Sequence, residues 1–238
     1  MEARLDDLQY KGLFLYQRPD LPRFTQDSVL LAAFANLTAR DMAVDIGAGT
    51  GALSLLCGAR TGAKFTAIEK DAALCELLRK SAAYNHIDLP VVEADWADAP
   101  RLLGCGGFTA ALCNPPYYAA GTQSPDQTRA LARGGADALK GAALTASRLL
   151  KNGGRLYLCY PADRLTDALV TLREHRLEPK RLRLVAQEAK SAPYLALVMA
   201  QLNARPHLDV QPVLFLKDED GDESGEYRRI YHIGNNED

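Results

Sequence analysis

The chain of 238 residues lacks any apolar run approaching the ~20 residues that a membrane-spanning helix needs. Its first residues, Met-Glu-Ala-Arg-Leu-Asp-Asp, contain no apolar signal-peptide core, so we expect a cytoplasmic protein without export. Cysteine is scarce, and the absence of any Cys-x-x-Cys pair argues against a disulfide framework and a zinc site. The five cysteines are residues 57, 75, 105, 113 and 159. The four histidines are widely separated, so we expect no metal and disfavour a metalloenzyme or a cofactor-free hydrolase.

The charge is nearly balanced, with 28 basic and 30 acidic residues and a net charge of −2. The acidic residues are unevenly distributed, because residues 218–226 contain six acids and no base. Without this acidic loop the remaining chain carries 28 − 24 = +4. A mildly basic body is compatible with nucleic-acid binding, although an ordinary protein surface explains the same charge equally well.

Apolar residues make up 47% of the chain and charged residues 24%, which predicts a folded core. From about residue 42 onward, short apolar runs alternate with helical patterns. The predicted strands are residues 42–46, 64–68, 90–93, 108–113 and 155–160, and the predicted helices are residues 28–36, 52–59, 72–84, 136–150 and 164–174. This alternation predicts a doubly wound, Rossmann-like α/β fold with a seven-stranded, mostly parallel sheet.

The last third of the chain departs from this alternation. Residues 181–185 and 194–202 both read as strands, and too little chain separates them for a crossover helix, so they should pair antiparallel. A third apolar run at residues 210–216 precedes the acidic loop. We expect a cap segment over residues 1–40, a catalytic domain over residues 41–205 and a C-terminal extension over residues 206–238.

The densest motif is the run from Asp45 to Gly51, Asp-Ile-Gly-Ala-Gly-Thr-Gly, which follows a predicted strand and opens a helix. Glycines allow a tight turn and a close approach of the backbone to a ligand at the helix N-terminus. The spelling also satisfies a loose dinucleotide pattern, and a glycine turn without a ligand is the plain alternative. The carboxylate of Asp45 would repel a pyrophosphate but suits a cationic ligand, such as the methionine end of S-adenosylmethionine.

Two further acids follow the next two predicted strands. Glu69 is placed to accept hydrogen bonds from both hydroxyls of a ribose, and Asp95 from an adenine amino group. Either acid alone is typical of an exposed surface, but acids after three successive strands indicate one ligand site. Trp96 either packs on the edge of an adenine or covers the sheet.

Asn114-Pro115-Pro116-Tyr117 follows the fourth predicted strand, where two prolines must take the chain out of the sheet. A stiff turn with an exposed tyrosine is the structural interpretation. In the functional interpretation, the Asn114 amide oxygen and the Pro115 carbonyl accept protons from a planar NH2 group, and Tyr117 stacks on the ring that bears it. Two such acceptors would favour a tetrahedral nitrogen with its lone pair aimed at a methyl donor, so catalysis rests on alignment and electrostatics.

Together these motifs resemble the class I S-adenosylmethionine-dependent methyltransferases, over roughly residues 10–205. The Asn-Pro-Pro-Tyr branch of that family methylates planar amino nitrogens, namely adenine in DNA or RNA and the glutamine amide of release factors. The resemblance implies S-adenosyl-L-methionine as cofactor and Asn114, Pro115 and Tyr117 as catalytic residues. The implied cofactor-binding residues are Asp45, Gly47, Gly49, Gly51, Glu69, Asp95, Trp96 and Asn114.

Within this branch the chain is most similar to bacterial enzymes that methylate the exocyclic nitrogen of adenine beside the anticodon of a valine tRNA. The similarity lies in Phe-Thr-Gln-Asp-Ser-Val-Leu-Leu at residues 24–31 and in Gly121 after the Asn-Pro-Pro-Tyr-Tyr run. In that family the upstream segment helps to close the cofactor pocket. The implied substrate contacts are Phe24, Thr25, Asp27 and Tyr118, with Arg129 and Arg133 on phosphates from a loop at residues 118–133, although a solvated loop explains the two arginines equally well.

Three functions therefore stand as hypotheses. The favoured one is an adenine methyltransferase acting on RNA, with tRNA as partner. A protein-glutamine methyltransferase is the second, although only about 40 residues precede the glycine motif, fewer than its helical recognition domain needs. A DNA methyltransferase would need a target-recognition domain of a size that is absent. The third is a non-catalytic RNA-binding module, against which the intact glycines and Asn114 count.

Overall fold

The computed structural model describes residues 2–116 and 125–231, and within residues 125–134 it describes only the helical backbone. The strands are β1 Arg4–Asp7, β2 Phe14–Gln17, β3 Met42–Ile46, β4 Lys64–Glu69, β5 Val91–Glu93, β6 Phe108–Cys113, β7 Leu150–Pro161, β8 Leu177–Ala186, β9 Leu195–Leu202, β10 Asp209–Val210 and β11 Leu214–Phe215. The α-helices are α1 Gln26–Phe34, α2 Ala52–Thr61, α3 Ala72–Tyr84, α4 Ala99–Leu103, α5 Pro125–Leu149, α6 Leu165–Glu174 and α7 Gly225–Tyr231, and the 3-10 turns are η1 Trp96–Asp98 and η2 Ala162–Arg164.

The large sheet has the order β10-β8-β9-β7-β6-β3-β4-β5, with β11 also paired to β8. Strands β3 to β7 are parallel, and β9 runs antiparallel to both β7 and β8. The predicted doubly wound sheet and the antiparallel terminal pair are therefore confirmed. The structure adds the two short strands β10 and β11, so the sheet has nine strands instead of seven.

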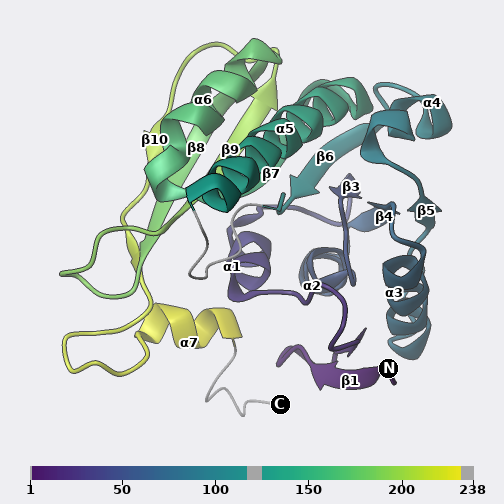
Figure 1. Ribbon diagram of the computed structural model, residues 1–238, viewed down its shortest axis with the longest axis horizontal. Helices are drawn as coiled ribbons and strands as arrows, with labels where there is room; N and C mark the ends of the chain where they lie inside the picture. Colours follow the sequence, from purple (N-terminus) through teal and green to yellow (C-terminus); the bar gives the residue numbers. More distant parts are fainter. Residues whose placement is uncertain (1, 117–124, 232–238) are drawn as a thin grey trace.

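Two layers of helices cover the sheet (Figure 1). On one face α1, α2 and α3 bury a cluster that includes Leu30, Leu56 and Leu78. On the other face α4, α5 and α6 bury a second cluster that includes Leu139 and Leu172. Because both faces are covered, the parallel strands are apolar along most of their length, as their sequences predict.

Helix α3 shows how a cap and a regular spacing of apolar residues define a helix in the sequence. Asp71 caps it by accepting hydrogen bonds from the N–H groups of Ala73 at 2.8 Å and Leu74 at 3.2 Å. Leu74, Leu77, Leu78 and Ser81 are then buried at spacings of three and four residues. The predicted bounds, residues 72–84, are confirmed for this helix.

Helices α1 and α5 start earlier than the sequence pattern predicts. Helix α1 spans 26–34 instead of 28–36, with Thr25 at its N-cap. The hydroxyl of Ser28, within this helix, contacts the side chain of Asn114. Helix α5 begins at Pro125, so the expected loop is wrong for residues 125–133, which are helical. A proline in the first turn favours a helix start, whereas the Gly-Gly pair at residues 134–135 opposes helix propensity.

The N-terminal hairpin β1–β2 and helix α7 carry signals too weak for the sequence pattern to find. The hairpin is held to α3 because Asn85 accepts from Phe14 N–H at 2.9 Å and donates to its carbonyl at 2.6 Å. Helix α7 lies against α1, where Gln26 Nε2 donates to Tyr227 Oη at 2.7 Å. Residues of the hairpin, of α1 and of α7 therefore pack into the same hydrophobic cluster.

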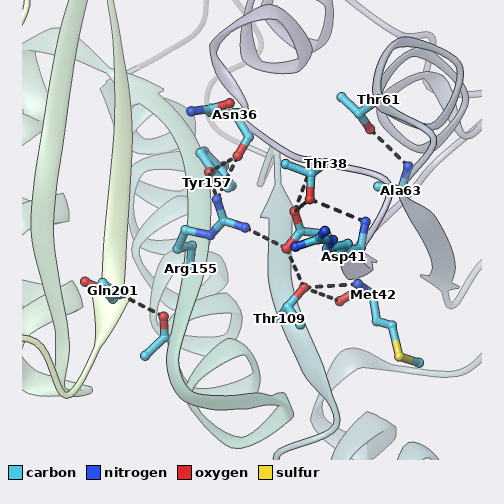
Figure 2. A network of polar contacts seen from close by, with 12 residues as sticks. Asn36, Thr38, Asp41, Met42, Thr61, Ala63, Thr109, Arg155, Tyr157 and Gln201 are labelled. Carbon is cyan, nitrogen blue, oxygen red and sulfur yellow. Dashed lines mark hydrogen bonds and ion pairs between the residues drawn. The ribbon is translucent and has the colours of Figure 1, made fainter.

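A polar network closes the amino ends of the central strands (Figure 2). Asp41, mostly buried, accepts from Arg155 at 2.6 Å, Thr109 Oγ1 at 2.7 Å and Thr38 N–H at 2.8 Å. Burial alone would raise the pKa of Asp41, but the hydrogen bonds from Thr109 and Thr38 and the Arg155 ion pair together lower it below the ordinary value. The network braces the edge of the sheet opposite to the carboxyl ends of the strands.

Along the described residues, no helix combines the length and the apolar character that crossing a membrane requires.

Candidate active site

A cavity of about 800 Å³ opens at the carboxyl ends of β3, β4, β5 and β6. Its wall is made of residues that follow those strands, together with the segment before α1 and the start of the described part of α5. The predicted site residues on this wall are Thr25, Asp27, Gly47, Glu69, Asp95, Trp96, Asn114 and Pro115. Ligands of open α/β sheets bind at this edge, so the structure brings these residues together where the topology requires.

The glycine turn between β3 and α2 takes conformations that favour glycine. Gly47, Gly49 and Gly51 have φ angles of +73°, +56° and +91°. A Cβ at Gly51 would lie 2.9 Å from Cγ of Leu78, and a Cβ at Gly47 would lie 3.2 Å from Cζ3 of Trp96. Gly51 is therefore required by packing against α3, whereas Gly47 borders the cavity itself.

Asp45 lies beneath this turn and outside the lining of the cavity. Its Oδ2 accepts from Ser54 Oγ at 2.7 Å and Ser54 N–H at 3.2 Å. Its Oδ1 is buried and has no hydrogen-bond partner among the described residues. Complete burial raises the pKa of Asp45 to about 7, with the bonds from Ser54 opposing the shift and the nearby charge of Glu69 adding to it.

Glu69 at the end of β4 is nearly buried and ties the glycine turn to the start of α3. Oε2 accepts from Gly49 N–H at 2.9 Å, while Oε1 accepts from the N–H groups of Lys70 at 2.8 Å and Asp71 at 3.0 Å. The carboxylate therefore stabilises the backbone of the glycine turn and of the start of α3, and it also lines the cavity. A carboxylate offers about four acceptor positions, so roughly one remains for a ligand.

Asp95 and Trp96 form the next part of the wall, after β5. Asp95 caps η1 by accepting from Ala97 N–H at 3.0 Å, and its side chain remains half-exposed. The indole of Trp96 lies between two glycines, because a Cβ at Gly141 would also lie 3.0 Å from its Nε1. Trp96 therefore packs against α5 and also borders the cavity.

Asn114 and Pro115 follow β6, where the chain leaves the sheet. Asn114 lines the large cavity and also a smaller one of about 70 Å³ beside it. Its Nδ2 donates to Ser28 Oγ at 3.0 Å, and its Oδ1 accepts from Cys159 Sγ at 3.1 Å. The amide is thus held between α1 and β7.

The segment before α1 forms the remaining wall. Thr25 and Asp27 line the large cavity and Phe24 lines the small one. Arg23 lines both cavities, and the sequence reasoning missed it. Its position directly before the Phe24 motif was the signal that could have found it. Lys70 and Asp137 also border the large cavity without having been predicted.

Four predicted site residues lie outside the part of the chain whose side chains the structure describes. Tyr117 and Tyr118 lie outside the described residues. Arg129 and Arg133 lie in the first part of α5, where only the backbone is described. Among the described side chains, no group of three or more His, Cys, Asp or Glu residues is arranged to hold a metal ion.

Comparison with solved structures identifies the fold. A predicted O-methyltransferase from Agrobacterium tumefaciens aligns with a TM-score of 0.70 at 21% identity, over 86% of this chain and 95% of that chain. A 16S rRNA methyltransferase from T. thermophilus, solved with AdoMet and guanosine, aligns with a TM-score of 0.60 at 18% identity, over 84% of this chain and 50% of that one. At these identities the likeness concerns the fold.

Curated relatives and a family model extend the comparison to sequence. The curated relatives include two that carry the name tRNA1(Val) (adenine(37)-N6)-methyltransferase. The one from Shewanella amazonensis is 43% identical over 45% of this chain and 46% of its own length, so the match spans about half of that relative. The one from Shewanella woodyi is 32% identical over 71% of this chain and 72% of its own length. The model described as "Methyltransferase small domain" matches residues 10–190, and the chain therefore belongs to the methyltransferase small domain family.

Proposed function

We propose that the chain is an S-adenosylmethionine-dependent methyltransferase that methylates the exocyclic amino group of adenine in tRNA. The observation that carries the proposal is that Asn114 and Pro115 line the same cavity as Glu69 and Asp95. Asn114 and Pro115 can hold a planar amine, and Glu69 and Asp95 can hold the nucleoside part of the cofactor in the same cavity. The names of the two Shewanella relatives support adenine in tRNA as the substrate.

The residues present fit this cofactor. Small-molecule sites usually measure about 300–1,000 Å³, and this cavity of about 800 Å³ lies within that range. Glu69 has roughly one acceptor position left for a ribose hydroxyl, and Asp95 supplies an acceptor for an adenine amine. When bound, S-adenosylmethionine supplies an electrophilic methyl group on a sulfonium.

Asn114 and Pro115 orient the acceptor amine. The Asn114 amide oxygen and the Pro115 carbonyl each accept one hydrogen bond from the NH2 group. Two acceptors on its hydrogens withdraw the nitrogen from conjugation with the ring, because they favour a tetrahedral nitrogen with a directed lone pair. The proline ring fixes the backbone that presents the carbonyl, so little conformational entropy is lost on binding. The amine loses its proton as the methylated product forms, which removes the need for a strong general base.

Substrate recognition stays a prediction for the tyrosines and arginines after the prolines. Tyr117 would stack on the extruded base, and Tyr118, Arg129 and Arg133 would contact the RNA around it. Phe24, Thr25 and Asp27 would close the pocket from the segment before α1. We also propose that residues 41–205 carry the catalysis, with residues 1–40 as a cap and residues 206–238 as an extension.

Transfer of tritiated methyl groups to bulk tRNA, followed by nucleoside analysis, tests the proposal. We expect N6-methyladenosine in tRNA that lacks the modification beforehand, and no label in release factor. Label in the glutamine of release factor alone would instead favour the protein-methylating alternative. Absence of both label and thermal stabilisation by saturating cofactor would overturn the enzymatic assignment.

A further inference from the structure

The amide of Asn114 is held on both sides by residues that the proposed function does not use. Its Nδ2 donates to Ser28 Oγ at 3.0 Å, and its Oδ1 accepts from Cys159 Sγ at 3.1 Å. Ser28 is buried on α1, and Cys159 is fully buried on β7. These partners lie 86 and 45 residues from Asn114 in the sequence, so only the folded chain assembles the arrangement.

The sheet register explains how Cys159 reaches the amide. Strands β6 and β7 are parallel neighbours, and Cys113 pairs with Leu158. The next residue on each strand is Asn114 or Cys159, so the two side chains meet where β6 ends. Helix α1 packs against β7 and places Ser28 on the other side of the amide. The upstream segment and the Asn-Pro-Pro turn are thereby joined through one side chain.

The orientation of this amide decides whether the proposed chemistry can work. The oxygen must face the substrate, because the NH2 end of the amide would meet the substrate NH2 as a second donor. Rotation about the terminal side-chain torsion of asparagine is broad and roughly two-fold, so the backbone alone does not select the orientation. A selecting contact has to come from neighbouring side chains.

The two partners together select one orientation. A thiol donates a hydrogen bond weakly and accepts even less well, so Cys159 favours the amide oxygen on its side. The serine hydroxyl then accepts from Nδ2. The amide oxygen has two acceptor positions, and the thiol uses one, which leaves the second for a substrate amine. We propose that Ser28 and Cys159 are positioning residues that keep the Asn114 oxygen available to the acceptor amine. This inference rests on the proposed function.

Matched substitutions separate positioning from ordinary core packing. Cys159→Ala removes the thiol donor, whereas Cys159→Ser keeps a hydroxyl donor. Cys57→Ala serves as the control, because Cys57 is equally buried but its thiol contacts the Ala32 carbonyl at 3.8 Å on α1. Ser28→Ala removes the acceptor from the other side. All four proteins are compared with wild type by thermal melting and by cofactor affinity.

For methyl transfer to tRNA, we expect Cys159→Ala and Ser28→Ala to lower kcat on the order of 10- to 100-fold, with cofactor affinity unchanged. Cys159→Ser should recover most of the lost kcat, and Cys57→Ala should lower the melting temperature without lowering kcat. Wild-type kcat in both Cys159→Ala and Ser28→Ala would overturn the positioning role and leave the proposed function intact.

A second readout does not depend on activity. The side-chain NH2 of Asn114, assigned by its absence from the NMR spectrum of Asn114→Ala, should exchange slowly with solvent in the wild type. We expect Ser28→Ala to speed this exchange, with Cys57→Ala leaving it unchanged. If wild type transfers no methyl group to tRNA while this response holds, the proposed function fails and the held amide stands. Equal exchange in wild type and Ser28→Ala would refute the held amide.

Discussion

Replacing Glu69 by glutamine probes how the cavity wall is held, because this carboxylate bonds three backbone N–H groups. Oε2 accepts from Gly49, and Oε1 accepts from Lys70 and Asp71, all within 3.0 Å. Glutamine keeps the shape but converts one acceptor oxygen into an NH2 donor. One set of backbone N–H groups must then lose its acceptor, and the remaining bonds lose their charge.

The magnitude follows from the number of bonds on each oxygen. The less costly placement turns the amide nitrogen toward Gly49 and leaves that one N–H unsatisfied. A lost hydrogen bond to a charged group costs about 1.5–3 kcal/mol. We therefore expect Glu69→Gln to lower the free energy of unfolding by about 2–3 kcal/mol in urea denaturation, which corresponds to a melting temperature about 5–10 °C lower in this size range.

Glu93→Gln is the matched control. Glu93 ends the neighbouring strand β5 and pairs with Glu69 in the sheet register. Its half-exposed carboxylate faces solvent and contacts Arg79 at 3.5 Å, so its loss should change the free energy of unfolding by less than about 0.5 kcal/mol. If the Glu69 and Glu93 variants denature alike, the carboxylate does not hold the glycine turn and the reasoning is refuted.

Three further predictions concern the turn and the two buried acids. Gly51→Ala should cost about 2 kcal/mol in urea denaturation, and Gly49→Ala about 1 kcal/mol, since both have positive φ but only the former meets a side chain, at 2.9 Å; equal costs would contradict this. The pKa of Asp41 is lowered in the folded state, so its contribution is present above the unfolded pKa and is lost as pH falls through the folded one. Asp41→Asn should therefore cost about 3 kcal/mol near neutral pH and progressively less in acid, and a constant difference would count against the ion pair. The pKa of Asp45 is raised to about 7, so the stability it contributes is fully present below the unfolded pKa of roughly 4 and is lost as pH rises from there through 7. Asp45→Asn should accordingly melt higher than wild type at about pH 8 but not at about pH 3, and parallel melting profiles would exclude a buried charge there.

The sequence predicted the helices and strands whose ends are marked by local signals, such as prolines or a capping residue. Strand β6 ends at the prolines and α3 begins at its Asp71 cap, so their bounds were readable from sequence. The start of α5 was not, because the glycine pair inside it opposes helix propensity and packing overrides that signal. Helix α7 depends on tertiary contacts, such as the ion pair at 2.7 Å between its own Glu226 and Arg183 on β8.

For the site, strand order placed the predicted residues at one edge of the sheet, but it did not reveal the hydrogen bonds and packing contacts by which they also hold the fold. Gly51 was predicted as a cofactor contact, and in the structure a Cβ there would also meet Leu78. Glu69 was assigned to a ligand, and in the structure it also bonds three backbone N–H groups. The contact between Asn114 and Cys159 depends on register across two strands, and one-dimensional spacing carries no information about it.

The central claim is that Asn114 acts on the acceptor amine beside a cofactor held by the neighbouring strand ends. The most direct measurement compares Asn114→Ala with wild type by calorimetric titration of S-adenosylmethionine and by methyl transfer to tRNA at saturating cofactor. We predict an unchanged dissociation constant together with a loss of transfer of about 100- to 1,000-fold. A variant that loses cofactor binding and methyl transfer in equal measure, or that transfers methyl groups at the wild-type rate, would contradict the account.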